Sequence, residues 1–227
     1  ENLPERRFLS SLIKKKNAGP ADLSLAAVQL ANIHADSGMS VREGETGKAE
    51  RFQALCDDML YQMKRYFDPS ITQPIIDMIR HPLDKFIHSK SNVFGKRLRK
   101  GRVVQGHGAL LPEHIHIQGE TVRFLSPHEV YKKYSVLDAA HDVATLMVDL
   151  IVANEQELAD HFLQKYKEAS RDKDLESILP AYQTYCALKH GVLTCERKVA
   201  LQDESLGPVA LEYFNLATRF SRTISKD

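Results

Sequence analysis

The sequence contains no tryptophan, only three cysteines, and no uninterrupted apolar run of the length that a membrane helix requires. Crossing a bilayer takes about 20 consecutive apolar residues, so the sequence excludes a membrane-spanning helix. No charged segment followed by an apolar one opens the chain, which argues against a secretory signal. An odd number of cysteines without metal-ligand spacing argues against a disulfide framework, so we predict a cytoplasmic protein.

An excess of charge of either sign is also missing. The sequence has 31 lysines and arginines against 30 aspartates and glutamates in 227 residues, a net charge of +1. This balance gives no reason to expect nucleic acid or a membrane surface as a partner. The local exception is the basic segment 96–102, which we interpret as a solvated loop, with a phosphate-facing patch as the alternative.

Apolar residues recur at helical spacing along most of the chain, which predicts a mainly α protein. Pro82 is expected to break or kink its helix, because proline removes a backbone hydrogen bond from a helix interior. No repeat or low-complexity linker divides the sequence, so we expect one domain over residues 1–227. The predicted helices cover residues 8–16, 20–37, 51–66, 74–87, 136–152, 155–168, 179–201 and 209–220.

The only predicted β structure lies near residues 102–125. Residues 102–105 favour a short strand, and 115–118 with 121–125 favour a hairpin. The hairpin should turn at Gly119-Glu120, where glycine adopts a positive φ at little cost.

The segment between the first strand and the hairpin, residues 106–114, reads Gly-His-Gly-Ala-Leu-Leu-Pro-Glu-His. In this context it resembles the catalytic loop of the aminoglycoside-phosphotransferase-like kinases, whose fold is protein-kinase-like. That family has His-Gly-Asp here, followed after four residues by Asn. His107 and Gly108 match the family, whereas Ala109 replaces the Asp and His114 replaces the Asn.

The resemblance implies that the chemical groups of the loop are missing. In these kinases the Asp accepts the proton of the substrate hydroxyl, the Asn holds Mg²⁺, and an acidic metal ligand ends the second hairpin strand. This last position is Leu125 here. Ala109 accepts no proton, and Leu125 offers no oxygen to a hard cation. The resemblance therefore implies a degenerate loop with no catalytic residue, no bound metal and no cofactor.

A second motif supports the resemblance. Residues 136–144 are similar to the family's Ile-Asp-X-X-X-Asp-Leu-Ala segment, in which two aspartates lie one helical turn apart at a helix start. Asp138 and Asp142 have this spacing. We expect both to be structural residues that accept backbone hydrogen bonds and tie the helix to the catalytic-like loop.

Further segments look like an uncharacterised bacterial branch of the family. These are residues 3–7, 25–34 and 182–192, and the basic positions of the last helix are Cys186 and His190 here. The resemblance spans nearly the whole chain and implies the helical C-lobe of the kinase-like fold, without the N-lobe. Nothing resembles a glycine-rich strand-turn-strand or a strand lysine, and an N-lobe upstream of Glu1 stays open.

The remaining motifs are weaker. Residues 44–49 faintly suggest a phosphate-binding loop, but Arg42 stands where the first glycine of that motif should be and Ala49 replaces its Ser or Thr, so we do not expect nucleotide there. The segment Ser126-Pro127-His128-Glu129 contains a nucleophile and a base that we do not expect to converge. The aromatic residues at helical spacing in the C-terminal third are predicted to be core: Tyr182, Tyr185, Tyr213 and Phe214.

The histidines near the hairpin offer a metal-binding alternative. In an extended strand His114 and His116 would point to one side, and a third ligand such as His107 or His128 could complete a site. Two histidines at this spacing are more often polar residues on a solvated strand face. His141 is predicted to be a packed or capping helix residue.

These observations together favour a non-catalytic, kinase-like domain that acts as a binding or scaffold module for an unknown protein or small-molecule partner. One alternative is an active small-molecule phosphotransferase that uses Glu113 or Glu129 and an unseen N-lobe. The other is a metal-binding domain centred on His114 and His116. The sequence does not identify the partner or the oligomeric state.

Overall fold

The computed structural model describes residues 3–37, 48–66, 72–125 and 136–224. These residues form nine α-helices and two two-stranded antiparallel sheets, which confirms the mainly α prediction. No helix in the described ranges is long and apolar enough to cross a bilayer. The chain divides into two compact units: unit 1 comprises residues 1–45 and 97–175, and unit 2 comprises residues 46–96 and 176–227.

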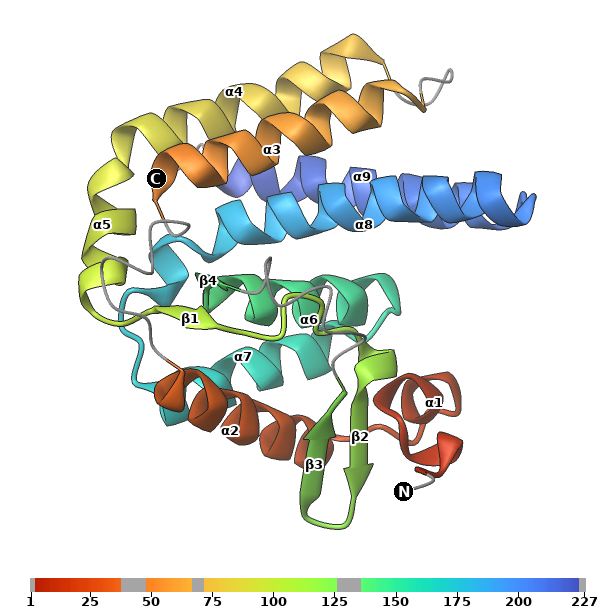
Figure 1. Cartoon of the computed structure of the whole chain (residues 1–227). Helices are drawn as coiled ribbons and strands as arrows, with labels where there is room; N and C mark the ends of the chain where they lie inside the picture. The colour runs from red at the N-terminus through yellow and green to blue at the C-terminus, as the bar shows by residue number, and fades with distance from the viewer. Residues whose placement is uncertain (1–2, 38–47, 67–71, 126–135, 225–227) are drawn as a thin grey trace. The chain divides into compact units, whose positions relative to one another are not determined.

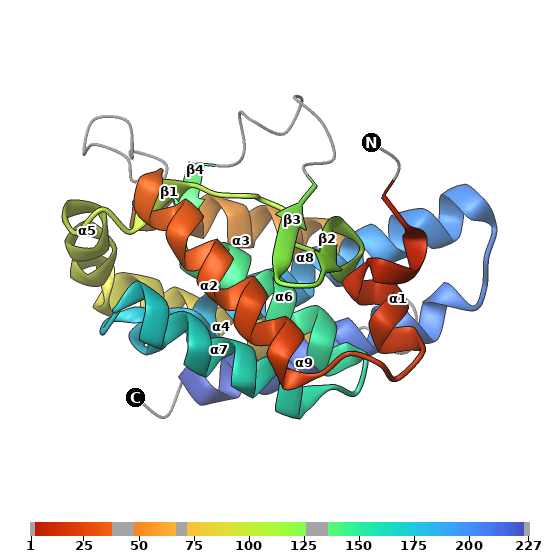
Figure 2. The same cartoon turned by 90° about the horizontal axis from the view of Figure 1, so that it is seen from below.

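Unit 1 is built around helix α6, in which nearly every residue is buried. Helix α2 packs along α7, and α7 packs along α6, as Figures 1 and 2 show. The helices of unit 1 are α1 (Leu9–Lys14), α2 (Pro20–Asp36), α6 (Ala140–Val152) and α7 (Gln156–Ser170), with the 3-10 turns η1 (Glu5–Arg7) and η3 (Pro112–His114). The 3-10 turn η5 (Leu175–Ser177) begins at the last residue of unit 1 and continues into unit 2.

The predicted hairpin is present in unit 1. Strands β2 (Ile115–Gln118) and β3 (Thr121–Phe124) pair in antiparallel register. Their turn falls at Gly119, whose φ of +60° is in the left-handed region that glycine tolerates. Helix α1 and turn η1 pack against β2, so the N-terminal segment covers one side of the hairpin.

The second sheet corrects the sequence prediction. Strand β1 (Val103–Gln105) pairs with β4 (Val136–Asp138), a segment that the periodicity assigned to a helix. Helix α6 begins only at Ala140. Valines suit an extended backbone, and pairing with a strand that lies more than thirty residues upstream overrides the apolar pattern.

Unit 2 is a separate helical cluster. Helices α8 and α9 pack along each other, α3 packs on α8, and α4 packs on α9 (Figure 1). The helices are α3 (Ala49–Lys64), α4 (Gln73–Ser89), α8 (Leu179–Leu201) and α9 (Leu206–Ile224), and α5 (Ser91–Arg99) leads from this unit into unit 1.

The aromatic core prediction holds for three of its four residues. Tyr182, Tyr185 and Phe214 are buried in unit 2, whereas Tyr213 is half-buried with its ring edge-on to His190. Cys186 is buried as well, so its thiol belongs to the core of unit 2.

Helix α4 runs through Pro82 without interruption, so the predicted break is wrong. Proline has no N–H to donate to the carbonyl four residues earlier, which is that of Met78. The hydroxyl of Ser221 on α9 lies 3.2 Å from this carbonyl and supplies a replacement donor. The neighbouring helix therefore satisfies the group that the proline leaves open.

The basic segment 96–102 is also not a solvated loop. Helix α5 extends to Arg99, and the Arg97 side chain is completely buried in unit 1. Its Nε and Nη2 donate to the two Asp138 carboxylate oxygens at 2.6 and 2.8 Å. Its Nη1 and Nη2 donate to the Asp172 carboxylate at 3.1 and 2.8 Å.

This arginine joins three segments through charge-assisted hydrogen bonds. Asp138 ends β4, and Asp172 follows the last turn of α7. Burial alone would lower the pKa of Arg97, but the Asp138 and Asp172 carboxylates outweigh it and raise the pKa above its ordinary value. The ion triad therefore fixes the end of α5 against β4 and the exit of α7.

Arg97→Met is expected to lower the free energy of unfolding by about 3–5 kcal/mol, because it leaves the buried Asp138 carboxylate without a cation and leaves Asp172 with only Arg102, at 3.7 Å. Urea denaturation measures the change. Arg99→Met is the matched control, since Arg99 is exposed on the same helix and should change stability by less than about 0.5 kcal/mol. Equal effects of the two substitutions would contradict the anchoring role.

Candidate functional site: the loop after strand β1

The loop of residues 106–114 lies between β1 and β2 in unit 1, and it brings His107, His114 and the backbone of Leu125 together. His107 Nε2 lies 3.0 Å from the Leu125 carbonyl, and His114 Nδ1 lies 2.8 Å from the Ala109 carbonyl. The two imidazole rings stack with their centroids 5.5 Å apart. The Leu125 amide donates to the His114 carbonyl at 2.8 Å and closes the loop onto the end of the hairpin.

Asp142, in the first turn of α6, holds this loop through hydrogen bonds to its backbone amides. Its Oδ2 accepts the His107 amide at 2.6 Å, and its Oδ1 accepts the Gly108 amide at 2.9 Å. The carboxylate is buried, and His34 Nε2 lies 3.2 Å from Oδ2. One side chain therefore sets the direction of two consecutive peptide units.

The ionised form of Asp142 is strongly favoured. Burial alone would raise the pKa of this carboxyl, but hydrogen bonds and charge from His141 and His34 outweigh it. The pKa is held well below its ordinary value. His141, predicted as a packed residue, is buried with Nδ1 3.5 Å from Asp142 Oδ1.

Gly106 allows the backbone to approach Asp142 this closely. A Cβ at this position would overlap Asp142 Oδ2 and would come within 3.6 Å of His34 Nε2. Gly106 is not among the sequence-predicted site residues, although a glycine that directly precedes a His-Gly pair at a strand end is a signal of close backbone approach.

Two further residues of the site carried no recognisable sequence signal. Tyr166 on α7 and His34 on α2 are buried, and His34 Nδ1 lies 2.8 Å from the Tyr166 hydroxyl. A carboxylate only accepts, so His34 Nε2 donates to Asp142; in a neutral imidazole Nδ1 then accepts the Tyr166 proton. Burial, then the charges of Asp172 and Asp138, raise the pKa of Tyr166, which keeps the hydroxyl protonated.

Asp138 anchors the same helix end. Besides binding Arg97, its Oδ1 accepts the Ala140 amide at 2.8 Å, which caps the start of α6. Two carboxylates one turn apart thus lie at the N-terminus of α6, where the helix dipole favours negative charge. Asp142 holds the loop, and Asp138 holds α5 through Arg97.

Several polar groups of the loop are bound within the site. Ala109 offers only a methyl group and a carbonyl, and that carbonyl is bound by His114. A carbonyl accepts, so both His107 and His114 spend a ring N–H on the backbone. Burial lowers the pKa of His107, with opposing effects from Asp142 and the Leu125 carbonyl, so this imidazole is neutral at pH 7.

The structure does not place His114 and His116 on one face of a strand. His114 ends the 3-10 turn η3, and only His116 lies on β2. His116 is buried against the Phe8 ring, with centroids 5.2 Å apart. Within the described ranges, no group of three or more His, Cys, Asp or Glu side chains is arranged to hold a metal ion.

Other candidates lie outside the described residues. Ser126, His128 and Glu129 belong to the segment 126–135, and most of the phosphate-loop-like segment falls within 38–47. Its last residue, Ala49, begins helix α3.

Comparison with known proteins places the chain near uncharacterised bacterial proteins. Matches include an uncharacterised protein of Mycobacterium tuberculosis, present in two strains, and one of Mycobacterium bovis, each 27% identical over 155 residues. The match covers 68% of this chain but 30% of the length of each relative, so the relatives are much longer. No family model and no solved structure matches. The chain is distantly homologous to these mycobacterial proteins.

Asp142→Ala is expected to lower the free energy of unfolding by about 1–3 kcal/mol at pH 7, because two amides and His34 lose their acceptor. The folded pKa is lowered, so the carboxylate stabilises the fold above its unfolded pKa of about 3.9, and this contribution is lost as the pH falls through the folded pKa. The deficit of the variant should therefore shrink below about pH 4.

Chemical denaturation across pH 3–8 measures this deficit. Asp160→Ala, which removes an exposed carboxylate from α7 in the same unit, is the control and should change stability by less than about 0.5 kcal/mol. A deficit for Asp142→Ala that is absent at pH 7 would show that the carboxylate does not hold the loop.

Proposed function

We propose that unit 1 contains the catalytic-loop scaffold of a phosphotransferase-like kinase C-lobe and that the protein is a non-catalytic binding or scaffold module. The observation that carries the proposal is a contrast within one loop. The anchors are complete, since Asp142 binds the amides of His107 and Gly108 and Asp138 caps α6. The positions that would carry the chemistry hold a methyl, an imidazole and an isobutyl group.

The anchoring contacts support a role for the loop's shape. Burying a carboxylate is costly unless its oxygens are hydrogen-bonded, and Asp142 meets this condition only when the backbone at His107 and Gly108 keeps its present course. A loop that is held so firmly without reactive groups is suited to presenting a fixed surface. We therefore assign it to recognition of a partner.

The length of the relatives agrees with a module of this kind. Because the match covers 30% of each relative, the corresponding region is one part of a longer protein there. A small-molecule or protein partner, including another region of a longer chain, fits the proposal. The proposal also includes a kinase-like ancestry and the organisation of residues 1–227 as a single domain.

The main rival is an active phosphotransferase that uses a substitute carboxylate. Glu113 lies on η3 with its side chain 60% exposed and Oε1 4.0 Å from His114 Nε2. A general base must be held within hydrogen-bond reach of its proton, and an exposed glutamate on a turn is poorly fixed. Glu129, the other substitute, lies outside the described residues.

Under the proposal, the chain binds Mg-ATP and Mg-GTP weakly or not at all, because His114 and Leu125 replace oxygen donors for the metal. Isothermal titration calorimetry with each nucleotide, with and without Mg²⁺, measures this. Low-micromolar binding that requires Mg²⁺ would contradict the non-catalytic proposal. If Glu113→Gln also abolished such binding, the substitute-carboxylate rival would be supported.

A restoration experiment separates the two hypotheses further. The triple variant Ala109→Asp, His114→Asn and Leu125→Asp should fold, since Leu125 is only half-buried and its hydrogen bonds are made by backbone atoms. It should gain Mg²⁺ or Mn²⁺ affinity, because oxygen ligands then converge beside the His107 ring, but little or no phosphoryl transfer.

The matched control is Glu120→Asp with Glu113→Asp, which keeps the carboxylates on the same loop and hairpin but adds none. Calorimetry with Mn²⁺ and a phosphotransfer screen are run on wild type, triple variant and control. Tight metal binding or turnover by the wild-type chain would overturn the proposal.

A further inference from the structure

A cavity of about 490 Å³ lies in unit 1, away from the catalytic-like loop. It is bordered by turn η1, helix α1, the segment that leads into α2, and the end of β2. Its polar lining comes from Arg6, Arg7, Lys15, Asn17 and Asp22, and Ile117 of β2 supplies an apolar wall. The volume is within the range of about 300–1,000 Å³ that small-molecule sites have.

The cavity lining carries an uncompensated positive charge. None of Arg6, Arg7 and Lys15 forms an ion pair with another residue in the described part of the chain, although the adjacent Lys16 pairs with Glu155 at 2.6 Å. The one acidic group of the lining, Asp22, is committed to structure, since its Oδ2 accepts the Gly19 amide at 2.9 Å and caps α2. Three cations against one carboxylate leave a net charge of +2 around the cavity.

The lining is anchored on ordered elements. Ile117 is buried on β2, which pairs with β3, and Leu12 of α1 borders the cavity between Arg7 and Lys15. Phe8, which follows the two arginines, bridges to His116 of β2. The backbone that carries the cations is therefore fixed against the hairpin, while their long side chains are exposed and can close on a ligand.

We infer that this cavity binds a small molecule that carries a diphosphate group. Two guanidinium groups can each bind phosphate oxygens in a bidentate manner, and an ammonium supplies a compact third charge. The Asn17 amide adds a neutral donor at the same cavity. A diphosphate has enough negative charge to match the net charge of the lining. The cavity is concave, so most of a long polyanion could not enter it.

This inference does not depend on the proposed function. The cavity uses none of the residues of the loop between β1 and β2, and its cations all precede α2. Free pyrophosphate, a nucleoside diphosphate and a sugar diphosphate share the group that the cavity recognises. Comparison of the three ligands distinguishes among these sources.

The test is isothermal titration of the 227-residue chain with inorganic pyrophosphate, followed by ADP and UDP-glucose, at 50 and 200 mM NaCl. We expect saturable one-to-one binding of pyrophosphate that weakens at the higher salt. The variant Arg7→Gln with Lys15→Gln should bind at least about tenfold more weakly, since it removes two charge-assisted contacts.

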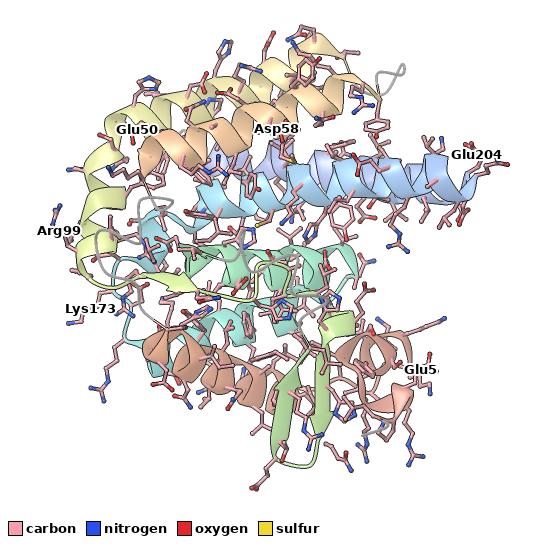
Figure 3. The ribbon with its side chains drawn as sticks, in the orientation of Figure 1. Glu5, Glu50, Asp58, Arg99, Lys173 and Glu204 are labelled. Atoms are coloured by element: carbon pink, nitrogen blue, oxygen red, sulfur yellow. The ribbon has the colours of Figure 1, made fainter. Side chains whose placement is uncertain are left out.

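The matched control is Arg99→Gln with Lys173→Gln, which removes the same two charges from exposed positions of the same unit. Figure 3 shows these residues at the end of unit 1 opposite to Glu5 of turn η1. The control should bind like wild type. Equal weakening in both variants, or no saturable binding by wild type at millimolar pyrophosphate, would overturn the inference.

Discussion

The carboxylate of Asp142 is the group on which the arrangement around the loop depends. It is buried at the start of α6, and it receives hydrogen bonds from the loop amides of His107 and Gly108 and from His34 of α2. Removing it would leave three donors from two segments without an acceptor, and such groups are costly when buried. Because both oxygens are engaged, the carboxylate supports the backbone and is not free to react.

Asp138 gives the same helix end a second attachment. Arg97 binds both Asp138 and Asp172, and Arg102 Nε lies 3.7 Å from Asp172 Oδ2, so two cations balance two anions in this group. The Asp138 carboxylate lies at the N-terminus of α6, where the helix dipole favours negative charge. Most residues of α6 are buried, and the carboxylates of Asp138 and Asp142 fix the start of this helix against the neighbouring segments.

Much of this arrangement could be predicted from the sequence, but only where the signal is local. Helical spacing predicted most helices, and Gly119 predicted the hairpin turn. The four-residue spacing of Asp138 and Asp142 predicted that both aspartates are structural residues at a helix start. Strand β4 escaped detection because three residues carry no periodicity and the partner strand is distant. The buried position of Arg97 could not be predicted, because a run of basic residues does not show which of them tertiary packing will bury. Asp172 and His34 likewise become site residues only through tertiary packing.

The two compact units are interleaved along the chain, and this order has a consequence for synthesis on the ribosome. Unit 1 is complete once Leu175 has been made, whereas helices α3 and α4 emerge long before α8 and α9, against which they pack. The carbonyl of Met78 meets its donor Ser221 only 143 residues later. During elongation, the apolar faces of α3 and α4 are thus exposed to other chains. A chaperone that binds nascent chains, or rapid translation of residues 176–227, would reduce aggregation of the nascent protein.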